Sequence, residues 1–541
     1  MSVSAKKDIE ELHVPAQSVQ QNSAAANNGF ADWSDYRKIA FRIAFVFFLI
    51  MCIPGTPGWY KHLVSIDWTN IHYRDLYDIC RFSNFQFVKM GPEARWGIGG
   101  YSNWGVTLLV AIAVGAIWSL LDRKSNNYEK LNYWLRVIVR YRAALGIIGF
   151  GFTKLLPVQM PYPSLGLLNT DLGDFSGQKI FWLSIGIVPW FQIYTGIVEV
   201  LAGVLLLFRK TTAWGAALLL GTLGTIAVVN IGYDGGVHVY ASYFVLLSAF
   251  LLVYDVKKIY ELLVLERVVR PVQRYYPAFK EKWQEYARWG IKAGLIAVFV
   301  VWFFYLQLLN FLYDPYKQPS AKGVTALRGN YQVTLFKLNN EEIPYSPLDT
   351  VRWQEVTFEK WSTLTYKVNK PVQLDLSNGG GDPMRDINRT FEVSGVGGGR
   401  RVFYYEADTI GNVLYLQDKN LATVAAEVGP GGIWDRRGRN QAEEKDPVYP
   451  ENWIPSEALA NIGDPVYKIN ARVVNTRRIR AFESEKPVKA RRKMVLKYDT
   501  SDGSRIVLTG TDENRDSLYV VLDRIDRPYV LSESTLEAGS Y

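Results

Sequence analysis

Two ionisable residues, Lys154 and Glu199, lie inside long apolar stretches of the sequence. The first is in LGIIGFGFTKLLP and the second is in FQIYTGIVEVLAGVLLLF. A charged side chain is costly in apolar surroundings, so within a membrane-spanning helix it is by default a candidate for function. An ammonium and a carboxylate that meet there can hold a polar cavity open, bind a quinone carbonyl or relay a proton. We therefore treat both as candidate catalytic residues. A purely structural ion pair is the alternative.

The depth of these two charges in a membrane follows from the nearest arginines. Lys154 follows Arg142 by ~18 Å, and Glu199 precedes Arg209 by ~15 Å, at ~1.5 Å per helical residue. If both arginines mark the inner boundary of an apolar core ~30 Å thick, both charges lie near its middle. We therefore expect the two side chains to pair or to share one polar cavity. The alternative is that Lys154 extends outward and Glu199 is neutralised by protonation or by a hydroxyl partner.

The elements that must position these residues are apolar runs long enough to cross a bilayer. Glycine and other small residues are dense in the central runs, which allows helices to approach closely. Residues 1–35 are polar and have no apolar core, so we interpret them as a disordered cytoplasmic tail and not as a signal peptide. The predicted spans cover residues 36–53, 101–121, 134–156, 186–208, 212–232, 236–255 and 289–313.

The distribution of Lys and Arg predicts how these spans are oriented. Both residue types are concentrated before the first span, in residues 122–142, at 209–210 and in residues 256–288. We interpret 256–288 as a basic amphipathic connector in the inner interface. The alternate loops are poorer in Lys and Arg. The positive-inside bias therefore predicts a cytoplasmic N-terminus, and seven spans then place the C-terminal domain outside.

A group of polar residues falls at or near the outer ends of the predicted central spans, close to the charged pair. We predict that they line a polar mouth that binds a ligand. Ordinary interfacial capping is the alternative for each member. The candidate ligand-binding residues are Tyr194, Gln159, Asn230, Tyr233, Asp234 and His238.

Cysteine and histidine offer little further chemistry. Cys52 and Cys80 fall on the predicted outer, oxidising side, where a disulfide is permitted, and free buried thiols are the alternative. The sequence has no CxxC motif, so we do not expect the chain to carry out thiol–disulfide exchange by itself. The spacing of His62, His72 and His238 does not indicate a metal site, and we predict none.

Three runs in the central region resemble the DoxX family of bacterial integral membrane proteins. They are G-F-x-K-L-x-P-x-Q at 151–159, Y-x-G-x-x-E-x-x-x-G-x-L-L-L-F-R at 194–209 and N-x-x-Y-D at 230–234. The resemblance covers roughly residues 136–255. It implies a four-helix membrane module and a role next to quinone or thiol redox chemistry. It indicates the fold more specifically than the reaction.

From residue 315 onward the sequence changes to short alternating β-rich runs separated by Asn, Asp, Gly and Pro, which are typical of an antiparallel barrel or sandwich. The G-x-Y at 329–331, the R-W at 352–353 and the late L-x-V-x-L at 518–522 resemble lipocalin-like barrels, in fold only. Residues 421–490 interrupt the strands as a long insertion with a short helix at 456–462. The predicted strands are 330–338, 351–361, 363–368, 371–376, 391–396, 401–407, 413–418, 494–500, 505–510 and 517–525.

We therefore predict an α-helical membrane protein with about seven transmembrane helices and a C-terminal extracytoplasmic, antiparallel, barrel-like β-domain. The aromatic content of 14% suits interfacial Trp and Tyr belts. The net charge of +9 is explained by basic cytoplasmic loops, so we do not expect nucleic acid as a partner. The predicted domains are the tail 1–35, the first two spans in 36–133 with an outer loop at 56–100, the DoxX-like bundle at 134–255, the connector and seventh span at 256–313, and the β-domain at 315–541.

The predicted function is that of a DoxX-like protein of the bacterial inner membrane, associated with quinone- or thiol-linked redox chemistry in the outer half of the bundle. A quinone is the candidate cofactor, and a quinone or another small amphiphile is the candidate ligand. The sequence leaves open whether the protein is an enzyme. The alternative is a non-catalytic, membrane-anchored module that binds a ligand or an envelope protein, or an accessory subunit of an envelope complex.

Overall fold

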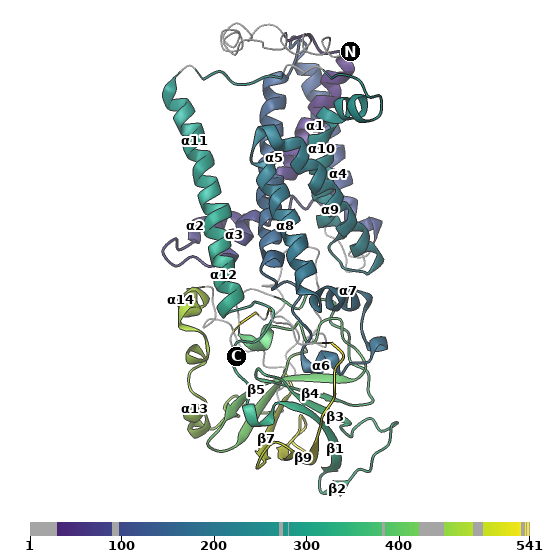
Figure 1. Ribbon diagram of the computed structural model, residues 1–541, viewed down its shortest axis with the longest axis vertical. Coiled ribbons are helices and arrows are strands. Elements are labelled where there is room, and N and C mark those ends of the chain that lie inside the picture. The colour runs from purple at the N-terminus through teal and green to yellow at the C-terminus, as the bar shows by residue number, and fades with distance from the viewer. Residues whose placement is uncertain are drawn as a thin grey trace, which may run out of the picture.

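The chain folds into a helical bundle and a β-barrel that lie end to end, with the N-terminal side of the bundle farthest from the barrel (Figure 1). One long loop of the bundle, 156–188, leaves the helices and contacts the barrel. The computed structural model describes residues 30–88, 97–269, 274–279, 281–380, 385–420, 448–479 and 491–531, with 536, 538 and 539.

Within these residues, five helices or continuous helix runs are long and apolar enough to span a membrane, and a bent pair would make a sixth. The bent pair is α1 with α2 (Pro57–Ser65), which meet at 53°. The last of the five runs from α11 through the π-helical η7 to α12. The long helices are α1 (Asp35–Cys52), α4 (Ser102–Leu121), α5 (Glu129–Leu155), α8 (Pro189–Leu206), α9 (Thr212–Gly232), α10 (His238–Leu263), α11 (Lys282–Ile296), η7 (Ala297–Trp302) and α12 (Phe303–Tyr313).

The predicted span at 212–232 has the same bounds as α9. The predicted connector at 256–288 differs from the structure. α10 continues to Leu263 and α11 begins at Lys282, so both helices extend into the predicted connector. The amphipathic run after Asp255 has no glycine or proline until Pro271, so a helix can continue past the boundary of the apolar span.

The outer loop at 56–100 contains helical structure that the sequence analysis missed. α3 (Tyr73–Cys80) is almost entirely buried and packs against α5 and α12. Hydropathy did not predict that this helix is buried, because it contains polar side chains such as Arg74 and Asp78. The predicted tail is also corrected at its end, because Trp33 is buried and its ring contacts Phe41. The rest of the tail, 1–29, lies outside the described residues.

Four helices contact one another in a ring: α5 packs against α8, α8 against α9, α9 against α10, and α10 against α5. Glycines make the first of these contacts unusually close. A methyl group added at Gly196 would collide with the backbone N of Leu155 and lie 2.8 Å from the carbonyl O of Gly151. One added at Gly203 would lie 3.1 Å from the carbonyl O of Ala144. α8 therefore lies with its backbone against the barrel-side half of α5.

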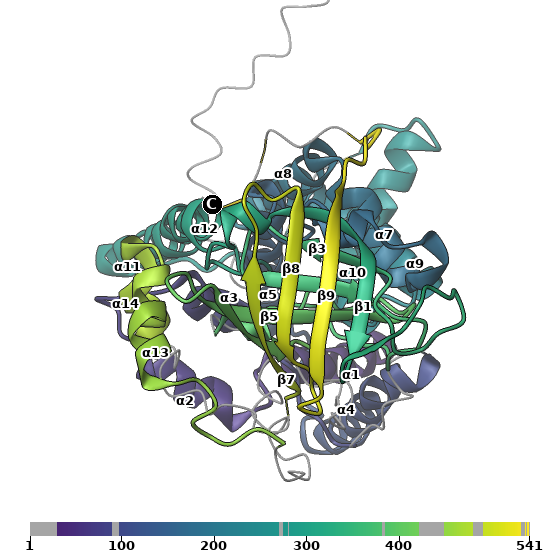
Figure 2. The same cartoon turned by 90° about the horizontal axis from the view of Figure 1, so that it is seen from below.

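Eight of nine antiparallel strands close into a barrel through the pairing of the first strand with the last, and Figure 2 shows β7, β8, β9 and β1 side by side. Aromatic and aliphatic side chains fill its interior, where Trp353 and Tyr366 stack with ring centroids 4.0 Å apart. The strands are β1 (Gly329–Leu338), β2 (Glu341–Glu342), β3 (Glu355–Phe358), β4 (Thr363–Lys367), β5 (Arg400–Asp408), β6 (Val413–Asp418), β7 (Lys493–Asp499), β8 (Arg505–Thr511) and β9 (Ser517–Ile525).

Two predicted strands, 371–376 and 391–396, are not strands in the structure. They belong to the segment between β4 and β5, which lies between the barrel and the bundle. Phe391 and Val396 are buried against Phe175 and Trp182 of the long bundle loop, and Val396 forms an isolated β-bridge with Phe175. These apolar residues therefore pack against the loop and do not form a strand of the barrel. The insertion at 421–490 separates β6 from β7, and its predicted helix is α13 (Ser456–Ile462). Residues 421–447 and 480–490 lie outside the described residues.

The backbone contact between α5 and α8 leads to a stability prediction. Gly196→Ala should lower the free energy of unfolding by roughly 1–3 kcal/mol, because the added methyl group has to push two helices apart. Gly221→Ala on α9 is the matched control, since nothing lies within 4 Å of its added methyl group. The measurement is unfolding of both variants by SDS in mixed micelles, followed by tryptophan fluorescence. Equal stability of the two variants would contradict the contact.

Candidate functional site

The structure brings Lys154 and Glu199 together, as the sequence analysis expected. The Lys154 ammonium donates a hydrogen bond to Oε1 of Glu199, and the two groups form an ion pair. Both residues are buried, with 8% and 1% of their surfaces exposed. Oε2 of Glu199 has no hydrogen-bond partner among the described residues. The pair is thus incompletely satisfied by the described residues, and a second polar group could bind there.

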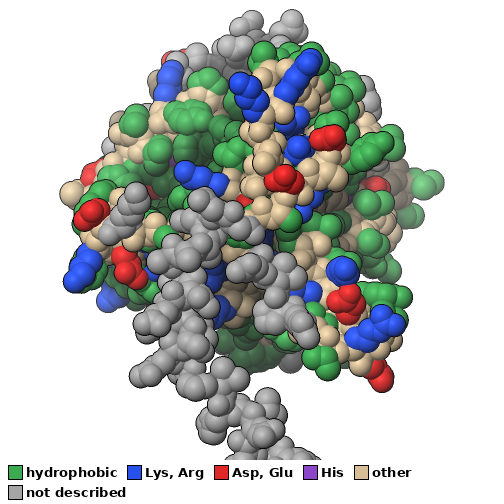
Figure 3. All heavy atoms as spheres, turned by 90° about the horizontal axis from the view of Figure 1, so that it is seen from above, with side chains coloured by type: hydrophobic (Ala, Val, Ile, Leu, Met, Phe, Trp, Pro, Cys, Tyr) green, Lys and Arg blue, Asp and Glu red, His purple; other side chains and the backbone are tan. Residues whose placement is uncertain are grey.

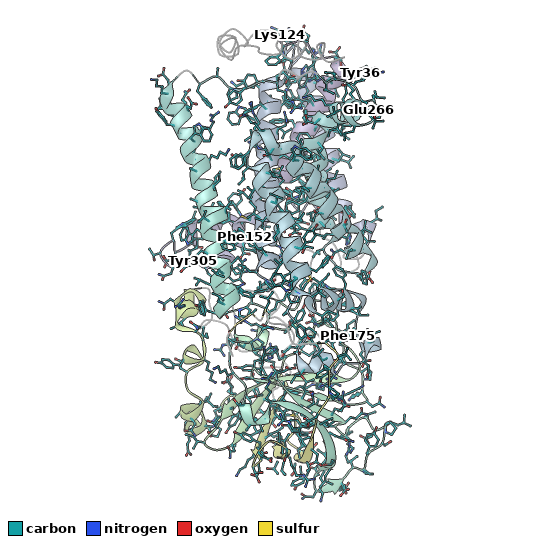
Figure 4. The ribbon with its side chains drawn as sticks, in the orientation of Figure 1. Tyr36, Lys124, Phe152, Phe175, Glu266 and Tyr305 are labelled. Carbon is teal, nitrogen blue, oxygen red and sulfur yellow. The ribbon has the colours of Figure 1, made fainter. Side chains whose placement is uncertain are left out.

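The glycines explain why these charges meet. Lys154 lies three residues after Gly151, and Glu199 lies three residues after Gly196. Residues three apart share one face of a helix, so each charge extends from the face on which its glycine touches the other helix. Lys154 is the penultimate residue of α5, and Figure 4 shows the nearby Phe152 in the half of the bundle toward the barrel. The pair therefore lies toward the barrel end of α5.

The candidate ligand-binding residues do not converge on the pair. Tyr194 is 61% exposed on α8, away from the buried face that holds Glu199. Gln159 accepts a hydrogen bond from the Thr153 hydroxyl at 3.3 Å, in the loop directly after α5. It is the candidate nearest to Lys154 in the chain.

The remaining four candidates lie around the turn between α9 and α10. Asn230 donates to the carbonyl O of Ile226, and the ring of Tyr233 lies 5.2 Å from that of Phe181. Asp234 is exposed and adopts a positive φ of 51°. His238 is buried at the start of α10, and its Nε2 has no partner among the described residues. They form a polar turn and not a shared pocket with Lys154.

Arg142 was expected at the inner boundary, and this expectation is wrong. It is buried inside the bundle, where it donates to the carbonyl O of Cys80 at 2.9 Å and lies 3.9 Å from the ring of Phe82. Its burial follows from α3, which the hydropathy pattern did not reveal. Cys52 and Cys80 are both free and buried, so the permitted disulfide is not formed in this structure.

The sequence analysis missed one uncharged polar residue in an apolar helix. Gln192 of α8 is fully buried and holds both polar groups of the Met160 backbone, accepting from its N–H at 2.9 Å and donating to its carbonyl O at 3.2 Å. This contact fixes the chain after α5 against the start of α8, close to the pair. An amide inside an apolar run was the signal that could have revealed it.

The long bundle loop closes the near end of the barrel through a second group of buried charges. The Glu359 carboxylate accepts from the backbone N–H groups of Leu165 and Gly166, at 3.1 and 2.7 Å, at the start of α6 (Leu165–Leu168). Lys419 pairs with Glu392 at 2.5 Å beside it. Figure 4 shows Phe175 of the same loop at this junction. The bundle and the barrel are therefore joined by polar contacts as well as by chain connection.

Two groups at this junction have strongly shifted pKa values. Burial, and then the negative charge of Glu392, raise the pKa of Glu359 to about 7. Burial lowers the pKa of Lys179, on α7 (Gly177–Gly186), to about 7, although Glu392 and Asp375 oppose the shift. The Lys179 ammonium donates to the carbonyl O of Phe391. Both shifts disfavour the charged form of the side chain. Burying either charge at the junction therefore costs free energy near neutral pH.

The fold combines five helices or helix runs, among the described residues, that are long and apolar enough to span a membrane with an eight-stranded antiparallel barrel toward the C-terminal end. Comparisons with models of protein families, with curated proteins and with solved structures find no match for this chain. The function therefore has to be argued from the site itself.

The buried ion pair leads to a double-substitution prediction. Lys154→Met should cost roughly 3–5 kcal/mol of stability, because it leaves a buried carboxylate without its cation. Lys154→Met/Glu199→Leu should recover most of this loss, since it removes both charges. Lys257→Met is the control, because its pair with Glu261 is exposed and worth less than about 1 kcal/mol. Unfolding in mixed micelles measures all three, and a single variant no less stable than the double variant would contradict the pair.

The pKa of Glu359 leads to a pH prediction. Because its pKa is raised from 4.5 to about 7 on folding, its contribution to stability is greatest below pH 4.5 and is lost as pH rises through 7. Glu359→Gln should therefore raise the melting temperature more at pH 8 than at pH 5, each time relative to the unaltered protein at the same pH. The shift corresponds to about 3 kcal/mol at most. Glu341→Gln, in an exposed strand, is the control, and an unchanged pH dependence in Glu359→Gln would contradict the assignment.

Proposed function

We propose that the protein is a DoxX-like protein of the bacterial inner membrane that binds a quinone, or another small amphiphile, at Lys154 and Glu199 and acts in quinone-linked redox chemistry. The observation that supports this most strongly is the unpartnered Oε2 of Glu199 beside the Lys154 ammonium. An ammonium donates to a quinone carbonyl, and a carboxylate accepts from a hydroquinone hydroxyl. The pair thus offers a partner to both redox forms of a quinone head group.

The orientation of the bundle supports a site in the outer half of the membrane. Lys124, Tyr36 and Glu266 lie at the end of the bundle far from the barrel (Figure 4), and the exposed cations of the first helix and of the turn after α4 lie at that end too. The positive-inside bias then makes this end cytoplasmic and the barrel extracytoplasmic. Lys154, near the barrel end of α5, falls in the outer half.

The site is closed in this structure. Lys154 and Glu199 are both buried, and Tyr194 is turned away from them. A head group would have to displace packed side chains before it reached the pair, and Gln192 with the chain after α5 forms the nearest polar wall. The proposed function therefore includes a local opening between α5, α8 and the loop that follows α5.

A second function is favoured by a different observation, the exposed apolar loop after β2. Tyr345, Leu348 and Val351 are 66%, 80% and 47% exposed on the barrel. Such clusters mark contacts with other proteins. In this second proposal the bundle anchors a barrel that binds an envelope protein. A ligand inside the barrel is not favoured, because aromatic and aliphatic side chains fill its interior.

The quinone proposal is tested by the quinone content of the purified protein. The unaltered protein should retain quinone through purification from its native membrane, and Glu199→Gln should lose most of it, because an amide cannot accept a charge-assisted hydrogen bond. Glu261→Gln, on the exposed end of α10, is the matched control and should retain it. The readout is organic extraction followed by chromatography and mass spectrometry.

An unchanged quinone content in Glu199→Gln would contradict the proposal. Absence of quinone from all three proteins, with capture of one envelope protein that is lost in Leu348→Asp, would favour the anchor function instead. Melting curves of each variant establish that the comparison is made between folded proteins.

A further inference from the structure

Three cations from different elements gather where α8 ends and α9 begins. They are Arg140 of α5, Arg209 of the short helix η6 (Arg209–Thr211) and Lys292 of α11. The ammonium of Lys292 lies over the ring of Phe208, the residue that precedes Arg209. Arg140 interacts electrostatically with both Arg209 and Lys292. Like charges repel at such distances, so the arrangement is unfavourable unless an anion joins it.

No described carboxylate forms an ion pair with any of the three. Asp255 of α10 and Glu285 of α11 are engaged by other arginines: Asp255 pairs with Arg274 at 2.5 Å, and Glu285 lies 3.8 Å from Arg288. The buried Nε of Arg140 has no hydrogen-bond partner among the described residues. Within the described part of the chain, the cluster therefore has one unused buried donor, the Nε of Arg140, and no carboxylate paired with its positive charge.

Aromatic rings hold the three cations in place. The ammonium of Lys292 lies 3.8 Å from the ring centroid of Phe208, and the guanidinium of Arg209 lies 4.3 Å from that of Tyr276. The guanidinium of Arg140 lies 5.3 Å from the ring of Tyr141. Tyr, Phe and Trp beside Lys and Arg are typical of the level at which a membrane protein meets lipid head groups.

The surface around the cluster is open to lipid. α11 has no buried residue, and its Trp289 and Ile291 are 54% and 66% exposed. Figure 1 shows α11 standing apart from α5 and α8 toward this end of the molecule. Seen from that end, Lys and Arg side chains stand among hydrophobic ones (Figure 3). An acyl chain beside α11 would place its head group at the three cations.

We propose that Arg140, Arg209 and Lys292 bind the phosphate of an anionic phospholipid whose acyl chains lie along α11. Guanidinium groups match the geometry of phosphate oxygens, and basic sites between membrane helices on the cytoplasmic side recognise anionic head groups. The site is at the opposite end of the bundle from the long bundle loop, and it does not depend on the function proposed for Lys154 and Glu199.

The test is native mass spectrometry of the full chain in detergent, titrated with phosphatidylglycerol or with phosphatidylcholine of the same acyl chains. Phosphatidylglycerol should bind with the higher affinity. Arg140→Ala/Arg209→Ala/Lys292→Ala should weaken its binding on the order of 100-fold, since each cation near a membrane surface contributes about fivefold. Lys292→Gln alone should weaken it by about fivefold without altering a buried residue.

Arg123→Ala/Lys124→Ala/Lys130→Ala, at the same end of the molecule, is the matched control and should bind as the unaltered protein does. Equal loss in this control would show general attraction to a basic surface and overturn the proposal. Equal affinity for phosphatidylcholine would overturn it too. Displacement of phosphatidylglycerol by glycerol phosphate at equal concentration would assign the site to free phosphate and would also overturn it.

Discussion

The contact between α5 and α8 is the constraint on which the rest of the bundle depends. Gly151 and Gly196 let the two backbones touch, and the same helix faces bring the ammonium of Lys154 to the carboxylate of Glu199. Each charge would be costly alone in apolar surroundings, so each makes the other acceptable. The helices can neither slide nor rotate without separating the charges or forcing side chains into the glycine contact.

This constraint extends from the bundle to the barrel. The chain leaves α5 directly after Lys154, is fixed by Gln192 of α8, and then supplies α6 and α7 to the near end of the barrel. There Glu359 caps the start of α6 and Lys179 reaches the segment before β5. A movement that opened the ion pair would pull on the loop that contacts the barrel. The buried pair and the barrel are in this way connected by about thirty residues of loop (156–188).

Much of this architecture could be predicted from the sequence, because apolar runs and alternating strands leave strong periodic signals. The helix at 212–232, the strands from β5 to β9 and the meeting of Lys154 with Glu199 were all within reach. What was missed depends on burial that composition does not reveal. α3 is polar yet buried, so Arg142 is interior. Residues 391–396 are apolar yet not a strand, because they pack on the bundle loop. The predicted topology places the polar residues from Asn230 to His238 near Lys154. In the structure they lie around the turn between α9 and α10, and sequence periodicity does not carry this information.

The central claim is that Glu199 is ionised and held by Lys154 within the bundle. Infrared spectroscopy at neutral pH tests it directly, through the difference spectrum between the unaltered protein and Glu199→Gln. The account predicts that the substitution removes a carboxylate band, which also disappears from the spectrum of Lys154→Met as the carboxyl becomes protonated. Loss of a protonated carboxyl band in Glu199→Gln, with no change in Lys154→Met, would show that Glu199 is already neutral beside Lys154 in the unaltered protein and would contradict the ion pair.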